Sequence, residues 1–188
     1  MLKNRIKNPI LRGTVDLLSM VVLAILLFLV VRAFLFRVAH VDGNSMAPTL
    51  EHGDLVILNR LVYVLGSPQV GDIVAFPYAD NPSDFFIKRV IAVPGDIVDL
   101  RDGVFYVNDL PIEDEFSYET IISLGNVTFP TPPIADGYIF VLGDNRNNSR
   151  DSRFADVGIN DDGMVRKRDV VGRGNLRIWP LGRWGRVN

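Results

Sequence analysis

The chain has 188 residues, 48% of them hydrophobic, and a formal net charge of −2. It contains no basic block with interleaved aromatic residues, so nucleic acid is not an expected partner. Cysteine is absent, which excludes a disulfide framework, a thiolate metal site and a cysteine nucleophile. The two histidines, His40 and His52, are not accompanied by carboxylates at the spacings of metal ligands, and we expect no metal and no other cofactor.

The N-terminal residues predict a membrane anchor. The first thirteen residues contain four basic side chains and no acidic one: Lys3, Arg5, Lys7 and Arg12. An apolar run then extends from Leu17 to Phe36, interrupted by Ser19 and Arg32. At a rise of about 1.5 Å per residue, this run crosses a bilayer core of about 30 Å if Arg32 extends its guanidinium to the interface. The lipid bilayer is therefore an expected partner.

A secretory signal that is cleaved off would begin in the same way. It would also need two small residues, separated by one residue of any type, after the apolar run. The candidates at Ala33 and Ala39 each have a large side chain two positions earlier, so we favour a permanent anchor over residues 14–36. The basic residues precede the span, which predicts that residues 1–13 lie in the cytoplasm and residues 37–188 on the far side of the cell membrane.

Residues 37–188 predict a mainly β domain. Short apolar runs follow turn dipeptides such as Gly-Asp and Asp-Gly, a pattern typical of strands and hairpins. The runs that we expect to form strands are Leu55–Leu58, Ile73–Phe76, Ile97–Leu100, Val104–Val107 and Tyr138–Leu142. Helical periodicity is weak here, so we expect antiparallel sheets or a partly closed barrel. Residues 109–137, rich in acids and prolines, predict an exposed, variable excursion from this domain.

Ser45 lies where the apolar run gives way to the predicted strands. Gly43 and Asn44 precede it and Pro48 follows, and these residue types are typical of sharp turns. A serine on such a bend exposes its hydroxyl and could act as a nucleophile. Most serines on turns only cap or satisfy the backbone, so this stretch alone leaves both interpretations open.

The run Phe85–Ala92 predicts a strand that places a lysine among apolar residues. Side chains alternate between the two faces of a strand, so Phe86, Lys88 and Val90 share one face. Burial lowers the pKa of a lysine, so a buried Lys88 could be neutral near physiological pH and act as a general base. The alternative is an edge strand in which the lysine stem packs and its amine reaches water.

A polar loop follows the predicted strand Tyr138–Leu142. Its sequence is Gly143-Asp-Asn-Arg-Asn-Asn-Ser-Arg-Asp-Ser-Arg153, which is dense in short polar side chains. Such a loop can form hydrogen bonds within itself and can supply an internal Asp–Arg pair. Taken alone, it is equally typical of a solvated turn.

Together these stretches resemble the bacterial type I signal peptidases (leader peptidases), a family of membrane-bound serine/lysine proteases. The matching stretches are Ser45–Leu50, Gly71–Phe76, Lys88–Asp96 and Gly143–Arg153. Their order, their spacing and the preceding anchor agree with this family over roughly residues 14–183. Four such motifs in order behind a membrane span are far more specific than any one of them.

The resemblance implies a serine endopeptidase that removes N-terminal signal peptides from exported preproteins and needs no cofactor. It implies that Ser45 attacks the scissile carbonyl, that Lys88 is the general base, and that the Ser45 backbone N–H serves the oxyanion. It further implies that Ser149 forms a hydrogen bond with Lys88. Asp151 and Arg153 are expected to pair and to hold the polar loop against the catalytic strand.

An extended substrate segment with small residues before the cut is also implied, bound in shallow apolar pockets. The candidate lining residues, each of which core packing would also explain, are Val41, Met46, Leu50, Phe86 and Ile87. Two positions depart from the family pattern. Gly43 stands where some members have a serine that also serves the oxyanion, and Asn147 stands where an aspartate is common.

Two other functions remain as alternatives. One is a dedicated maturation peptidase with the same chemistry and a narrow substrate. The other is a non-catalytic, membrane-tethered β domain that binds peptides. A Lys88 side chain on the surface of the folded protein would favour the second alternative.

Overall fold

The computed structural model describes residues 9–77, 85–112, 121–157 and 162–187. The chain divides into two units, Met1–Phe36 and Arg37–Asn188. In the first unit, helix α1 (Pro9–Leu35) contains a stretch, Pro9–Leu29, that is long and apolar enough to cross a membrane by length and composition. Proline suits the first turn of this helix, where its missing N–H has no partner to lose.

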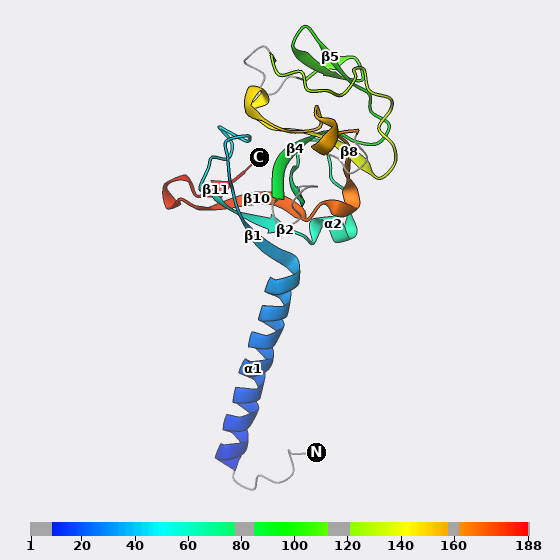
Figure 1. Ribbon diagram of the computed structural model, residues 1–188. Coiled ribbons are helices and arrows are strands. Elements are labelled where there is room, and N and C mark those ends of the chain that lie inside the picture. Colours follow the sequence, from blue (N-terminus) through cyan, green and yellow to red (C-terminus); the bar gives the residue numbers. More distant parts are fainter. Residues whose placement is uncertain (1–8, 78–84, 113–120, 158–161, 188) are drawn as a thin grey trace. The chain divides into compact units, whose positions relative to one another are not determined.

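The second unit contains a main sheet with the strand order β1-β2-β10-β3-β4-β8-β9, in which β11 also pairs with β10 (Figure 1). The bounds of these strands are β1 Phe36–His40, β2 Leu55–Asn59, β3 Ile73–Pro77, β4 Phe85–Ala92, β8 Tyr138–Leu142, β9 Val165–Arg166, β10 Gly172–Trp179 and β11 Gly185–Arg186. A smaller sheet has the order β5-β6-β7, with β5 Val98–Arg101, β6 Val104–Val107 and β7 Leu110–Pro111. The short helical elements are α2 Val62–Leu65, η1 Arg146–Asn148, η2 Ala155–Val157, η3 Lys167–Asp169 and η4 Leu181–Arg183.

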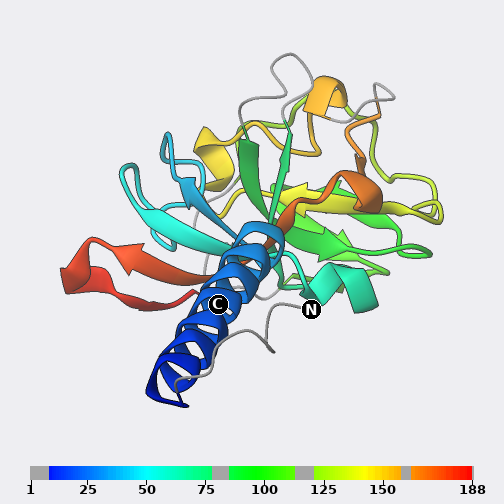
Figure 2. The same ribbon diagram turned by 90° about the horizontal axis from the view of Figure 1, so that it is seen from below.

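This architecture confirms the prediction of a mainly β fold behind an N-terminal apolar helix. The ladders between β2 and β10, β3 and β4, and β4 and β8 are all antiparallel. The strand order starts at β1 and ends at β9, so within the described residues the main sheet does not close into a complete barrel. Figure 2 shows β10, in orange-red, next to β2, in cyan.

Strand β4 lies inside the main sheet, between β3 and β8. Its register places Lys88 opposite Val74 of β3 and Arg89 opposite Leu142 of β8. From Ile87 onward every residue of the strand is buried. The alternative in which the Lys88 amine reaches water is therefore wrong, because Lys88 is only 2% exposed, although β8 pairs with β4 only from Arg89 onward.

The hydrophobic core is divided into clusters, and one of them includes apolar residues from both sides of Ser45 in the sequence. Val41, Met46 and Leu50 come from the segment around this serine and pack with side chains of β2, β3 and β4. Each fully buried apolar side chain of this size stabilises the fold by about 1.5–3 kcal/mol. Apolar residues both before and after the serine are thus anchored in the core, which fixes the path of the segment between them.

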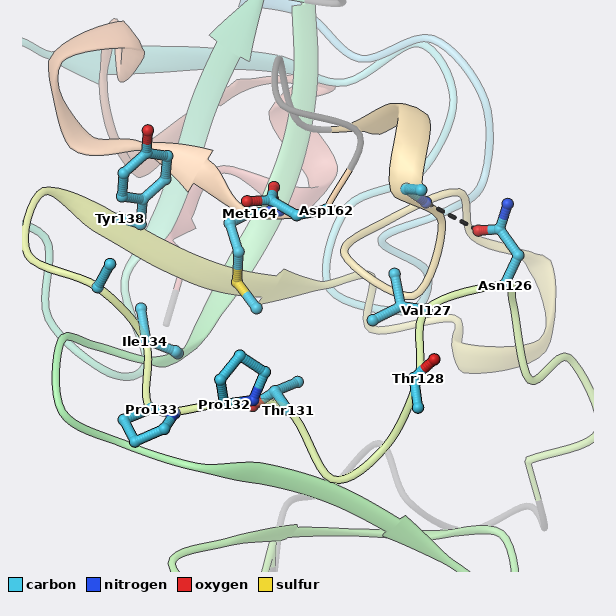
Figure 3. A pocket seen from close by; sticks show the side chains of 12 residues that line it. Asn126, Val127, Thr128, Thr131, Pro132, Pro133, Ile134, Tyr138, Asp162 and Met164 are labelled. Atoms are coloured by element: carbon cyan, nitrogen blue, oxygen red, sulfur yellow. Dashed lines mark hydrogen bonds between the residues drawn. The ribbon is translucent and has the colours of Figure 1, made fainter.

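The structure corrects part of the prediction for residues 109–137. Ile121, Thr131 and Ile134 are buried, and the two isoleucines pack with Phe105 and Phe140 in a second core cluster. The segment therefore covers an apolar face that the small sheet would otherwise expose to water. It also forms one side of a cavity of about 520 Å³, with Met164 on the other side (Figure 3). The predicted acidic cluster, residues 113–119, lies outside the described residues.

Adjacent isoleucines in this segment provide a test of its packing. Ile121 is 4% exposed and Ile122 is 78% exposed. We expect Ile121→Ala to lower the free energy of unfolding by about 2–5 kcal/mol, because it leaves a cavity in the core. The matched Ile122→Ala variant should stay within about 0.5 kcal/mol of the wild type. Urea unfolding in detergent measures both; equal effects would show that the segment is not part of the core.

Candidate active site

Ser45 lies on a loop of residues 41–54, here called the serine loop. Two backbone hydrogen bonds close the base of this loop. The Val41 N–H donates to the Asp54 carbonyl oxygen over 2.9 Å, and the Gly53 N–H donates to the Val41 carbonyl oxygen over 3.0 Å. Ser45 itself is half-buried. The two ends of the loop that carries the serine are therefore held together by backbone hydrogen bonds.

The two departures from the family pattern have local structural explanations. Gly43 has a φ of +86°, a left-handed conformation in which a serine would be strained. Backbone geometry therefore favours the glycine over a side chain that could serve an oxyanion. Asn147 accepts a hydrogen bond from the Ile122 N–H over 3.0 Å, so its amide connects the polar loop to the segment that follows residue 120.

The structure brings Lys88 to Ser45. The Lys88 Nζ lies 2.8 Å from the Ser45 Oγ, within hydrogen-bond distance, and it donates to the Ile87 carbonyl oxygen over 3.0 Å. The amine also lies 4.8 Å from the centre of the Phe86 ring, as expected for residues on the same face of a strand. Only 2% of Lys88 is exposed. Two residues that are 43 positions apart in the sequence thus form a serine–lysine pair, and its lysine is shielded from water.

Burial changes the protonation of this lysine. Loss of hydration is the largest influence and lowers the pKa of Lys88 from 10.5 to about 8. The carboxylates of Asp151 and Asp144 act in the opposite direction, and the guanidinium of Arg153 lowers the pKa further. A substantial neutral fraction therefore exists near pH 8, and a neutral amine next to a hydroxyl can accept its proton.

The polar loop, residues 143–153, bonds to Ser45 and to the residue that follows Lys88. The Asn145 N–H donates to the Ser45 carbonyl oxygen over 3.0 Å, and the Thr49 hydroxyl donates to Asp144 over 2.6 Å. Arg89, the residue after the lysine, donates from two nitrogens to the two carboxylate oxygens of Asp144, each over 2.8 Å. The loop thereby fixes the serine loop relative to strand β4.

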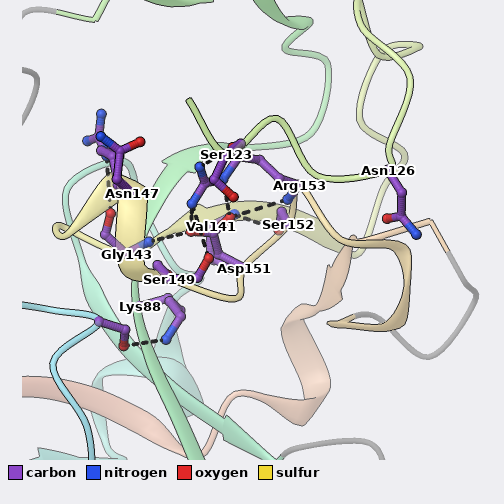
Figure 4. A network of polar contacts seen from close by, with 12 residues as sticks. Lys88, Ser123, Asn126, Val141, Gly143, Asn147, Ser149, Asp151, Ser152 and Arg153 are labelled. Carbon is purple, nitrogen blue, oxygen red and sulfur yellow. Dashed lines mark hydrogen bonds and ion pairs between the residues drawn. The ribbon is translucent and has the colours of Figure 1, made fainter. Parts of the chain in front are cut away.

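Asp151 and Arg153 form a fully buried ion pair inside the polar loop (Figure 4). The guanidinium donates to both carboxylate oxygens, over 2.8 and 2.9 Å. It also donates to the carbonyl oxygens of Ser123 and Ser149, and the Gly143 N–H donates to Asp151 over 3.0 Å. These contacts satisfy both buried charges, and breaking one partner would leave the other uncompensated.

The hydrogen bond expected between Ser149 and Lys88 is not formed. Ser149 is 8% exposed, and its hydroxyl has no hydrogen-bond partner among the described residues. A Cβ atom on Gly143 would lie 2.2 Å from this hydroxyl and 2.4 Å from the Ser45 carbonyl oxygen. The hydroxyl therefore packs against the Gly143 backbone. The lysine amine instead lies within hydrogen-bond distance of the Ser45 Oγ and the Ile87 carbonyl oxygen.

A cavity of about 260 Å³ opens at the serine–lysine pair. Four of the five predicted substrate-binding residues line it: Val41, Met46, Phe86 and Ile87. Leu50 does not line it. Its N–H bonds back to the Met46 carbonyl oxygen over 2.9 Å, and this turn directs the Leu50 side chain into the core, where it is 0% exposed.

Sequence reasoning missed several residues of the site. Phe85, Asn148 and Arg150 also line the cavity, and Thr49 and Asp144 connect the two loops. All of them lie within or next to the matching motifs, but no spacing rule shows which side chains will face one another. Within the described residues, no group of three or more His, Asp or Glu side chains is arranged to hold a metal ion.

The lowered pKa of Lys88 predicts a specific dependence of stability on pH. Folding lowers this pKa, so the unfolded chain binds the proton more tightly, and the wild type gains stability as the pH rises from about 8 to 10.5. Lys88→Met keeps the side-chain volume and lacks this titration. We expect its stability relative to the wild type to fall by about 3 kcal/mol between pH 7 and 10.5. Urea unfolding at both pH values measures this; a constant difference would show that the lysine is not desolvated.

Comparison with known proteins bears on the family to which this chain belongs. The model of the family "Signal peptidase, peptidase S26" matches residues 14–179. A probable signal peptidase I-1 from Synechocystis sp. is 32% identical over 90% of this chain and 85% of its own length. The signal peptidase I of Bacillus caldolyticus is 37% identical over 80% of this chain and 83% of its own length. A crystal structure of a signal peptidase I from Enterococcus faecalis is 30% identical, covers 57% of this chain and 97% of its own, and aligns with a TM-score of 0.45. Because the family model matches most of the sequence, the chain belongs to the S26 family of signal peptidases.

Proposed function

We propose that this protein removes N-terminal signal peptides from exported preproteins, with Ser45 as the nucleophile and Lys88 as its general base. The observation that carries this proposal is the 2.8 Å contact between the Ser45 Oγ and a Lys88 Nζ that is 2% exposed. Homologues named signal peptidase I match most of the chain and support the same reaction.

The reaction follows from the geometry of the pair. The Ser45 Oγ attacks the scissile carbonyl carbon while the neutral Lys88 amine takes the hydroxyl proton. The developing oxyanion accepts a hydrogen bond from the Ser45 backbone N–H. Lys88 then gives its proton to the leaving amine, which departs as the new N-terminus of the mature protein. In the second half, Lys88 takes a proton from a water molecule that attacks the ester carbonyl carbon. Lys88 then returns this proton to the Ser45 Oγ, and the signal peptide leaves with a new C-terminal carboxylate.

Asp151, Arg153 and Ser149 have supporting roles in this proposal. The buried Asp151–Arg153 pair holds the polar loop, and the loop holds the Ser45 carbonyl through Asn145. Ser149 contributes through its carbonyl oxygen, which accepts from Arg153 over 3.2 Å, and through its contact with the Gly143 backbone. None of these groups needs to exchange a proton with the substrate.

The substrate segment before the cut is proposed to bind as an added strand next to β4. Strand β8 pairs with β4 only from Arg89 to Ala92. The first half of β4, Phe85–Lys88, lines the cavity and pairs with β3 along the opposite edge. The small volume of this cavity suits small side chains before the cut, because larger ones would have to displace the buried Val41 and Ile87.

The position of Lys88 bears on the two alternatives. A peptide-binding domain without catalysis would have no need to bury a lysine amine, and burial of an ammonium without a function is unfavourable. The buried Lys88 therefore argues against that alternative. A maturation peptidase with a narrow substrate would use the same pair, so only the range of substrates separates it from the proposed function.

Variants of the pair test the proposal directly. We expect Ser45→Ala and Lys88→Met to lower kcat for cleavage of a model preprotein in detergent by at least about 10³-fold, because each removes a group that acts in the transition state. Ser67 is exposed and does not line the cavity, and Ser67→Ala is the matched control. Full activity in a folded Lys88→Met variant would contradict the mechanism. A folded wild type that cleaves only one of many preproteins would favour the maturation peptidase.

For the location, the proposal is a single-pass protein of the bacterial plasma membrane with residues 1–13 in the cytoplasm and the β domain outside. Support comes from the helix Pro9–Leu29, which could cross a membrane, and from the basic residues that precede its apolar run. Signal peptides are cleaved after they emerge on the far side of the membrane, so a catalytic domain tethered there meets its substrate.

Single cysteines can test this orientation because the natural chain has none. Asp136 is an exposed position in the β domain, and Asn4 lies in the basic N-terminal segment. In spheroplasts we expect a membrane-impermeant maleimide to label Asp136→Cys at once and Asn4→Cys only after permeabilisation. The cysteine-free protein is the control for background labelling. The reverse pattern would place the β domain in the cytoplasm.

A further inference from the structure

We propose that Arg177 is a positioning residue for Ser45, acting from the C-terminal hairpin through the backbone of the serine loop. This inference rests on the function proposed for Ser45. The hairpin is formed by β10 and β11, and Arg177 lies in its middle, opposite Val56 of β2 on one side and Gly185 of β11 on the other. A register irregularity between Arg177 and Trp179 marks a bulge in β10, a feature that can redirect a side chain.

The Arg177 guanidinium contacts the serine loop at two points. It donates to the Thr49 carbonyl oxygen over 3.0 Å, and it approaches the Asp54 carboxylate to 3.4 Å. A third bond, from Nε to the Arg183 carbonyl oxygen over 2.6 Å, fixes the direction of the guanidinium. Arginine suits this task because its planar fork presents several donors in a fixed geometry.

Asp54 is the buried carboxylate that the C-terminal hairpin contacts in the serine loop. It is 1% exposed, and its carboxylate also accepts from the Arg183 guanidinium and from the Glu51 N–H, the latter over 3.0 Å. Burial raises the pKa of Asp54, but the Glu51 N–H and the Arg183 guanidinium outweigh burial and hold this pKa below its usual value. The carboxylate therefore remains ionised over the working range of pH, and its charge holds the two arginines.

Thr49 links this contact to the catalytic pair. Its carbonyl oxygen accepts from Arg177, while its hydroxyl donates to Asp144, which in turn binds Arg89. Thr49 is thus held from both sides, by the C-terminal hairpin directly and by strand β4 through Asp144. Since Arg89 follows Lys88 directly, the chain of contacts sets the distance between the serine loop and the lysine strand. Release of Arg177 would remove the bond to the Thr49 carbonyl oxygen, while Arg183 would still hold the loop at Asp54.

The expected consequence is a loss of kcat at nearly constant KM. A displacement of a reacting atom by about 1 Å costs roughly 100-fold in rate, so we expect Arg177→Ala to lower kcat by about 10- to 100-fold. KM should stay within about threefold, because Arg177 does not line the substrate cavity. The pH midpoint of kcat/KM should not move, because Arg177 has no contact with Lys88. Arg177→Lys should recover part of kcat, because an ammonium can reach one of the two acceptors.

The experiment compares the full-length wild type with Arg177→Ala, Arg177→Lys, Arg186→Ala and Ser45→Ala on one model preprotein in detergent. Arg186 lies exposed on the same hairpin and is the matched control, which should keep wild-type kcat. The rate of Ser45 phosphonylation by a small fluorophosphonate gives a second measurement, independent of the substrate strand. We expect this rate to fall in Arg177→Ala as kcat does.

Each outcome decides the inference. Wild-type kcat in Arg177→Ala, a loss confined to KM, or an equal loss in Arg186→Ala would overturn it. If thermal unfolding shows that Arg177→Ala is not folded, the folded Arg177→Lys variant decides. Reduced kcat at constant KM in that variant supports positioning, and unchanged kcat contradicts it. Cleavage by Ser45→Ala would instead overturn the proposed function. An inactive Ser45→Ala beside a fully active Arg177→Ala would overturn only the role of Arg177.

Discussion

The desolvation of the Lys88 amine is the constraint on which the rest of the site depends. Burial lowers its pKa to about 8, but carboxylates nearby would restore the charge if they faced it unpaired. The two relevant carboxylates, Asp144 and Asp151, are each bound by an arginine, Arg89 and Arg153. These pairs therefore do two things at once: they hold the loops together, and they weaken the field that would keep the lysine protonated.

A second constraint is the need to hold a loop and a strand at hydrogen-bond distance. The serine loop is anchored in the core by apolar side chains on both sides of Ser45 and bonded to the polar loop through its backbone. Gly143 allows this approach because any side chain there would collide with Ser45 and Ser149. The distance of 2.8 Å between the Ser45 Oγ and the Lys88 Nζ is thus a property of three segments that are far apart in the sequence.

Much of this arrangement is predictable from residues alone. The strands around Leu55–Leu58 and Ile73–Phe76 follow from turn chemistry and apolar runs, and the motif order identifies Ser45 and Lys88 as a pair. The misses have a common cause. The sequence predicts Leu50 in the substrate pocket and a hydrogen bond from Ser149 to Lys88, and the structure shows neither. Both predictions depend on where a side chain points after two loops have packed, and the spacing of residues does not specify this direction.

The sequence by its own pattern determines the element types, the membrane-length helix and the residues proposed to carry the chemistry, because these depend on local periodicity and residue type. Tertiary structure alone decides that β4 lies between β3 and β8 in the sheet order, that residues 121–134 cover the core, and that Lys88 is shielded from water. The same lysine with its amine in water would be a solvated cation. Its reactivity depends on exclusion of water and on neighbouring charges, and both are created only when distant segments meet.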